Sequence, residues 1–198
     1  LAPSSRNPNN GDSRDGAKAQ TLADQVDPSQ ARAEEAAFQS AAQSLRQALQ
    51  DLPELAELSK NIIIDETPEG LRIQLVDQEG RSMFNANSVQ PNDRAKLLLR
   101  AISKVINQLP NRISIYGHTS ANLHGSRPES DWPLSSGRAN AARQILQSSG
   151  VDPDRVYQVS GKAGSEPLYP DDPTLPGNRR IAIVLLREAP VLPPNPAL

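Results

Sequence analysis

The sequence predicts an α/β protein, a two-layer sandwich in which helices cover one face of a mixed sheet, preceded by an extra N-terminal helix. Strand-like and helix-like hydrophobic patterns follow one another in the order β-α-β-α-β-β. A helix between two strands implies a parallel crossover, whereas the last two strands are joined by a loop and should be antiparallel. Aromatic residues make up only 3% of the chain, so Leu, Ile, Val and Ala must build the core.

The two ends of the chain lack the apolar periodicity of a folded domain. Residues 1–30 are rich in small and polar residues, Pro and Gly, and we expect a flexible linker there. Residues 189–198 are rich in Pro and should form an extended tail. The part that folds should therefore comprise a helical segment, residues 31–60, and a domain, residues 61–188.

The helical segment carries one apolar stripe with spacings of 4, 3, 4 and 3 residues, formed by Phe38, Ala42, Leu45, Leu49 and Leu52. Pro53 should end this helix. The stripe has two interpretations, because it can pack on its own domain or pair with a second copy of the chain. A conditional role combines them, in which the helix packs on the domain in one state and extends in another.

The domain should begin with a β-hairpin. The apolar run at residues 61–65 is followed by turn chemistry at residues 67–70, and residues 71–76 alternate like a half-buried strand. A long apolar stripe then predicts a helix, with Pro91 at its first position. Residues 113–116 should form the next strand.

The second half of the domain contains two long loops. Its expected elements are a loop at residues 117–133, a helix at 137–149 capped by Gly150, a strand at 156–159, a loop at 164–178 and a final strand at 180–186. Both loops should lie at the same end of the sheet. Loops of this length in a compact domain are usually functional, so we expect the site there.

Composition and charge exclude several classes of function. A net charge of −2 argues against a partner made of nucleic acid, and the absence of Cys excludes thiolate metal sites and cysteine nucleophiles. The longest aliphatic run, residues 181–186, is too short to span a bilayer. His118 and His124 lack a ligand spacing, so we expect no metal and no other cofactor. We expect His118 to anchor its loop through hydrogen bonds.

An enzymatic reading of the same loop is weak. Ser120, His118 and Asp131 are the residue types of a catalytic triad, but no nucleophile elbow surrounds Ser120. A hydrolase therefore stays a remote alternative, and we expect a protein that is not an enzyme.

The segment from Asp131 to Ala139 predicts an anion site. Ser135 or Ser136 is a natural N-cap, which would place Arg138 in the first helical turn beside unpaired backbone N–H groups. The alternative is an Arg138 paired with a nearby acid, either Asp131 or Glu129. Two further arginines, at positions 179 and 180, begin the last strand as a solvated strand start or as additional anion contacts.

Four segments together resemble the OmpA-like peptidoglycan-binding domain, over about residues 70–187. They are residues 113–119 (ISIYGHT), 131–139 (DWPLSSGRA), 161–167 (GKAGSEP) and 178–181 (NRRI). The resemblance implies a non-catalytic domain that binds the peptidoglycan stem peptide. The site residues that it implies are Thr119, Ser120, Asp131, Leu134, Ser135, Arg138, Asn178 and Arg179.

The chain departs from the family pattern at one important position. The family usually has Asp after Gly-His-Thr, and this chain has Ser120. In the family that Asp, with the arginine matching Arg138, holds the zwitterionic end of diaminopimelate. Asp131 stands where the family often has Asn and is the candidate for a compensating charge.

Within the family, the chain most resembles the stator subunits of bacterial flagellar motors. Trp132 before the Leu-Ser pair, Ser82-Met83-Phe84 and the preceding helix carry this resemblance. It implies the periplasmic part of a protein anchored in the inner membrane by one N-terminal helix outside this chain. The implied partners are peptidoglycan, a second copy in a homodimer, the membrane subunit of the stator and the flagellar P-ring. An envelope lipoprotein or outer-membrane protein tail is the alternative.

Overall fold

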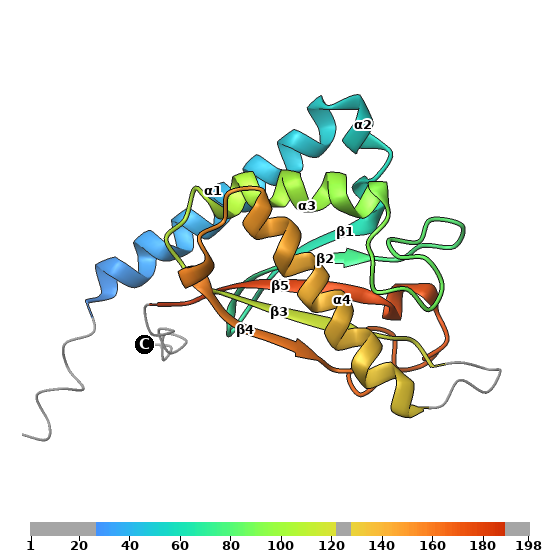
Figure 1. The fold of residues 1–198 in the computed structure, drawn as a ribbon. Helices are drawn as coiled ribbons and strands as arrows, with labels where there is room; N and C mark the ends of the chain where they lie inside the picture. Colours follow the sequence, from blue (N-terminus) through green and yellow to red (C-terminus); the bar gives the residue numbers. More distant parts are fainter. Residues whose placement is uncertain (1–26, 122–127, 189–198) are drawn as a thin grey trace, which may run out of the picture.

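The computed structural model describes residues 27–121 and 128–188, shown as a ribbon in Figure 1. Five strands form one sheet: β1 (Ile62–Thr67), β2 (Gly70–Val76), β3 (Ile113–His118), β4 (Val156–Gly161) and β5 (Arg180–Leu186). The helices are α1 (Pro28–Asp51), α2 (Pro53–Ala56), α3 (Asp93–Ile106) and α4 (Pro128–Ser148), with short 3₁₀ turns at Ser59–Asn61, Pro153–Arg155 and Pro176–Asn178. Helices α1, α3 and α4 lie on one face of the sheet (Figure 1), which confirms the predicted sandwich.

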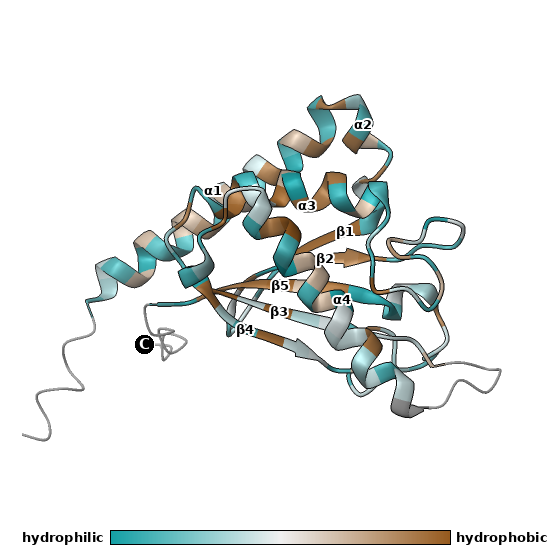
Figure 2. Cartoon of the chain, viewed as in Figure 1, coloured by the Kyte–Doolittle hydropathy of each residue, from teal (hydrophilic) through white to brown (hydrophobic). Residues whose placement is uncertain are grey.

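The strand order is β1-β2-β5-β3-β4. β1 and β2 form the predicted hairpin, and β3 and β4 are parallel neighbours linked through α4. β4 and β5 run in opposite directions, but the expectation that they pair is wrong, because β5 lies between β2 and β3 and is antiparallel to both. The nearly continuous apolar sequence of β5, brown in Figure 2, suits this central position, where all of its residues except Leu186 are buried.

Helix α1 packs within its own domain. Phe38, Ala42, Leu45 and Leu49 are buried in the common core, whereas Leu52 at the end of the stripe is 50% exposed. Pro53 separates α1 from α2 as predicted. α1 begins at Pro28, capped by the Asp27 carboxylate, three residues earlier than the expected start of the helical segment at residue 31. The rest of that linker and the tail at 189–198 lie outside the described residues.

The start of α4 differs most from expectation. The helix begins at Pro128, so Ser135 and Ser136 lie inside it and neither is an N-cap. Pro133 is accommodated inside the helix, where a proline costs one main-chain hydrogen bond rather than ending the helix. Arg138 therefore lies at the midpoint of α4, and the proposed first-turn anion site is wrong.

Close contact with two strands fixes the position of α4. A Cβ atom at Gly117 of β3 would lie 2.0 Å from the Ser135 carbonyl oxygen, and one at Gly161 of β4 would lie 2.2 Å from Ser136 Oγ. Only glycine permits this approach. The helix is capped at its other end by Gly150, whose φ of +101° confirms the predicted C-cap.

The start of α3 is shifted by two residues. Asn92 is its N-cap and accepts a hydrogen bond from the Ala95 N–H at 3.0 Å, so Pro91 precedes the helix instead of opening it. Within residues 27–121 and 128–188, no helix combines the length and apolar character that a bilayer crossing requires.

Candidate functional site

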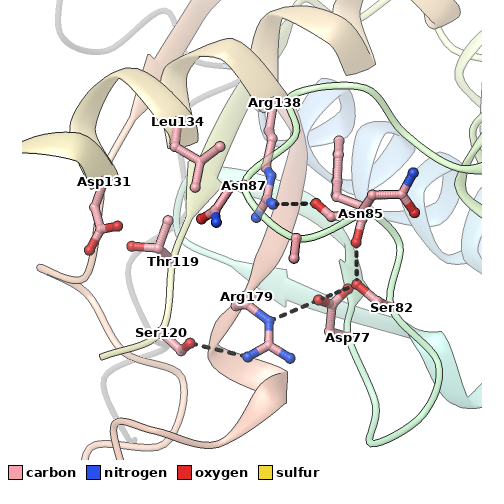
Figure 3. A pocket seen from close by; sticks show the side chains of 12 residues that line it. Asp77, Ser82, Asn85, Asn87, Thr119, Ser120, Asp131, Leu134, Arg138 and Arg179 are labelled. Atoms are coloured by element: carbon pink, nitrogen blue, oxygen red, sulfur yellow. Dashed lines mark hydrogen bonds and ion pairs between the residues drawn. The ribbon is translucent and has the colours of Figure 1, made fainter. Parts of the chain in front are cut away.

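A cavity of about 520 Å³ lies where α4, the end of β3, the segment before β5 and the loop after β2 meet (Figure 3). Its lining residues are Asp77, Ser82, Phe84, Asn85, Ala86, Asn87, Thr119, Ser120, Asp131, Leu134, Arg138 and Arg179. The two long loops predicted to meet do so beside this cavity, because the Ala121 N–H donates to the Pro173 carbonyl at 2.8 Å. Arg179 Nη1 lies 3.3 Å from Ser120 Oγ.

Most of the predicted site residues line this cavity, and two do not. Ser135 is fully buried; its hydroxyl donates to the Trp132 carbonyl at 3.0 Å and accepts from the Ala163 N–H at 3.1 Å. Asn178 is also fully buried, and its side chain binds the backbone of Tyr169 and Asp172. Both residues hold the surrounding loops in place instead of facing the cavity.

Arg138 is the central cation of the cavity. Its side chain is 6% exposed, and the guanidinium lies over the Phe84 ring, 4.9 Å from the centroid. Nε donates to the Ser88 carbonyl at 2.8 Å and Nη2 to the Asn85 carbonyl at 3.2 Å. The predicted alternative, a pairing with an acid, is therefore wrong for Asp131. Among the described residues no carboxylate forms an ion pair with Arg138.

Burial lowers the pKa of Arg138 most. The nearby carboxylates of Asp77 and Asp131 act in the opposite direction, and the cation Arg179 lowers it further. An arginine nevertheless keeps its charge at any physiological pH, so the cavity contains a permanent buried positive charge. A buried charge without a counterion is costly, because neutral carbonyl oxygens only partly replace water. This cost is relieved when an anion binds.

Arg179, in contrast, already has its counterion. Its Nε donates to Asp77 Oδ2 at 3.0 Å, and the Asp77 carboxylate is almost fully buried. The same carboxylate accepts from the Met83 N–H at 2.7 Å and from Ser82 Oγ at 3.1 Å. Arg179 thus joins the start of β5 to the loop after β2 and leaves the free positive charge to Arg138.

The opposite wall of the cavity offers groups for a cation. Asp131 is half-buried at the start of α4, and Figure 3 shows its carboxylate beside Thr119. Thr119 is buried, and its Oγ1 has no hydrogen-bond partner among the described residues. Leu134 adds an apolar contact between Asp131 and Arg138. A guanidinium and a carboxylate separated by an apolar surface are complementary to a zwitterion.

The loop that follows β2 was not predicted to be part of the site. Asp77, Asn85 and Ser88 belong to a polar stretch before Pro91, and this stretch supplies one wall of the cavity and both carbonyl partners of Arg138. The length of this segment between a strand and a helix could have identified it, because the two other long loops were predicted to be functional from their length.

The catalytic triad is not assembled. His118, the last residue of β3, lines a different cavity from the one that contains Ser120 and Asp131. The expectation that His118 anchors its loop through hydrogen bonds stays a prediction, and its Nδ1 is buried without a partner among the described residues. Over the described ranges, no three His, Asp or Glu side chains gather as metal ligands. His124 lies outside those ranges.

The sequence and the fold have counterparts in known proteins. Residues 83–180 match the model of the OmpA family. These residues form an OmpA family domain. The matched range contains the whole of α3, β3, α4 and β4, and every cavity-lining residue except Asp77 and Ser82.

Relatives of the OmpA domain include a motility protein. The chain is 38% identical over 146 residues to Motility protein B of Escherichia coli K12, an alignment that covers 73% of this chain and 47% of the relative. The chain thus spans about half the length of the curated relatives it matches. It is also 26% identical to the crystal structure of the periplasmic domain of Helicobacter pylori MotB, with a TM-score of 0.53 over 64% of this chain and 89% of that one.

The fold of the OmpA domain also occurs in another cell-envelope protein. A cell wall anchor of the type VI secretion system from Pseudomonas aeruginosa has a TM-score of 0.55, is 19% identical, and is matched over 68% of this chain and 95% of that one. At this identity the likeness concerns the fold alone.

Proposed function

We propose that this chain is the periplasmic wall-anchoring part of a flagellar stator subunit and binds peptidoglycan without catalysis. The observation that carries the proposal is Arg138, a buried guanidinium with neutral partners only, at the edge of an open cavity. The relationship to Motility protein B supports the motor context.

The ligand we assign to the cavity is the zwitterionic end of a stem peptide. Its carboxylate binds Arg138, and its ammonium binds Asp131, which takes over the role of the acid that Ser120 replaces. Leu134 contacts the methylene chain between the two charges. Arg179 positions Ser120 and the loop after β2 and does not carry the ligand charge, since Asp77 neutralises it.

The wider assembly follows from the motility relative. In this proposal the chain lies in the periplasm, and the whole protein is held in the inner membrane with a MotA-type partner and reaches the flagellar P-ring. The chain acts as a homodimer. Because the apolar stripe of α1 is buried against its own domain, the dimer contact involves another surface or a state in which α1 is released.

Co-sedimentation with purified peptidoglycan tests the assignment. Arg138→Ala should weaken binding by about tenfold or more, because a charge-assisted contact is lost. Arg143→Ala is the matched control, since Arg143 lies on the same helix, binds only Asn140 and Gln147, and lies outside the cavity. Equal binding by the Arg138 and Arg143 variants would contradict the site, provided that circular dichroism shows both to be folded.

A second variant tests the ammonium half of the ligand. Ser120→Asp restores the usual family acid beside Thr119 and should strengthen binding. Stronger binding would mean that Asp131 compensates only in part for the missing acid. Weaker binding would mean that Asp131 suffices for the ammonium and that a second carboxylate beside it causes repulsion. Release of soluble muropeptides in the same assay would instead support the hydrolase and contradict a non-catalytic anchor.

A further inference from the structure

A second cavity, of about 310 Å³, lies on the face of the sheet that the helices leave uncovered. Its floor is formed by Ala182 and Val184 of the central strand β5, whose small side chains leave a depression between longer neighbours. The turn at residues 67–69 forms one wall, and Lys162 and Glu166 form the other. It shares no lining residue with the cavity around Arg138.

The register of the sheet places polar side chains around this floor. Ala182 pairs with Gln74 of β2 and Tyr116 of β3, and the preceding cross-strand row joins Arg180 to His118. Arg72 flanks Val184 in the row on the other side. Strands far apart in the sequence therefore bring three cationic side chains, those of Arg72, Lys162 and Arg180, to one depression.

Arg180 is a buried cation without a counterion. It is 8% exposed, and its guanidinium donates to Gln74 Oε1 at 2.9 Å, to the Asn178 carbonyl at 3.1 Å and to the Glu166 carbonyl at 2.8 Å. All three acceptors are neutral. Among the described residues no carboxylate pairs with Arg180, whereas Arg72 has Asp65 and Lys162 has Glu166.

Two buried polar atoms at the same place also lack partners within the described ranges. Gln74 is 1% exposed. Its Oε1 accepts a hydrogen bond from Arg180, whereas its Nε2, the donor of the same amide group, has no partner among the described residues. His118 is 5% exposed, and its Nδ1 has no partner. Buried polar groups are normally satisfied, so the unpaired Gln74 donor beside an uncompensated cation indicates a missing acceptor with negative charge.

We propose that this cavity binds a small oxyanion, a carboxylate or a phosphate group, between Gln74 Nε2 and the guanidinium of Arg180. The electrostatic potential at the site agrees with an anionic ligand. Burial and, after it, the charges of Arg180, Lys162 and Arg72 together lower the pKa of His118 to about 3, so the imidazole is neutral and the potential around it is positive. The site is independent of the wall-binding role proposed for Arg138.

The test is an NMR titration of the ¹⁵N-labelled full chain at pH 7 with sodium acetate and with sodium phosphate, each against sodium chloride of equal ionic strength. Saturable shifts of the Gln74 side-chain amide and of the backbone amides of Tyr116, His118 and Ala182 are expected. Comparison of the affinities for acetate and for phosphate shows whether the site prefers a carboxylate or a phosphate group. Shifts that sodium chloride reproduces would overturn the proposal, as would the absence of any saturable shift with both anions.

Gln74→Glu is the decisive variant, because it places a permanent carboxylate beside Arg180 Nε. It should weaken anion binding at least tenfold and raise the melting temperature. Gln158→Glu is the matched control, since it adds the same charge at an exposed position of β4 and should leave binding nearly unchanged. Lys162→Met, at the rim, should weaken binding two- to fivefold without affecting the fold. Wild-type affinity in both Gln74→Glu and Lys162→Met would overturn the site.

Arg138→Ala separates this proposal from the proposed function. That variant should lose peptidoglycan binding and keep the anion response at Gln74. A loss of the Gln74 response in Arg138→Ala would show that the anion binds in the other cavity and would overturn the second site.

Discussion

Arg179 and Asp77, 102 residues apart in the sequence, are joined through both side chain and backbone. Arg179 Nε donates to Asp77 Oδ2 at 3.0 Å, and the Asp77 N–H donates to the Arg179 carbonyl at 3.0 Å. The same carboxylate holds the Met83 N–H. This connection shapes the wall of the Arg138 cavity, because it fixes the loop after β2 against the start of β5.

Replacement of Asp77 should destabilise the domain. Asp77→Ala removes three hydrogen bonds to a buried carboxylate and leaves Arg179 unpaired, at a cost of about 3 kcal/mol. The measurement is urea unfolding followed by circular dichroism. Asp65→Ala is the control, because the Asp65–Arg72 pair is about one-third exposed and should contribute less than about 1 kcal/mol. Equal losses in the two variants would contradict this account.

The contact between α4 and β3 predicts a strong effect of one methyl group. Gly117→Ala places a Cβ 2.0 Å from the Ser135 carbonyl, so α4 must shift, and the free energy of unfolding should fall by about 2 kcal/mol or more. Because Arg138 lies on α4, peptidoglycan binding should weaken as well. Gly164→Ala has no contact closer than 3.9 Å and should change stability by less than about 0.5 kcal/mol. Wild-type stability of Gly117→Ala would disprove the close approach.

His118 predicts a pH-dependent stability. Its pKa is lowered from 6.5 to about 3 in the folded state, mainly by burial, so below pH 6.5 the unfolded chain binds a proton that the folded chain does not. The contribution is constant above that pH. It is lost as the pH falls from 6.5 towards 3, by up to about 1.4 kcal/mol per pH unit.

Urea unfolding of the wild type and of His118→Gln between pH 7.5 and 4.5 measures this effect. The difference in stability between the two proteins should change with pH only below about 6.5, in favour of the variant, because Gln does not titrate. A difference that stays constant over the whole range would show that His118 is not buried in neutral form.

Two residues of the apolar stripe of α1 should differ strongly in their contribution to stability. Phe38→Ala should cost about 3–5 kcal/mol, since the ring is fully buried and lies under the Arg187 guanidinium at 5.4 Å. Leu52→Ala should cost less than about 0.5 kcal/mol because Leu52 is half exposed. Light scattering provides the second readout. A change in molecular mass with Leu52→Ala would place the stripe in a contact between two copies.

Local patterns predicted much of the fold and part of the site. The periodicity of apolar residues located every strand and long helix, because burial of one face imposes a period of 2 or 3.6 residues. The loops after β3 and before β5 were found by their length, and Arg138 by its neighbours. The first turns of α4 were missed because Pro133 and the two following serines resemble a helix start, while packing against Gly117 and Gly161 extends the helix beyond them.

The sequence by itself determined the fold class, the extra N-terminal helix and half of the residues that line the cavity, since these depend on local periodicity and on short motifs. Only the tertiary structure decided which charges are compensated. Asp77 neutralises Arg179, whereas Arg138 and Arg180 are surrounded by neutral acceptors. The physical reason is that the partner of a buried charge is set by strand order and loop packing, which join residues far apart in the sequence, such as Gln74 and Arg180, 106 positions apart.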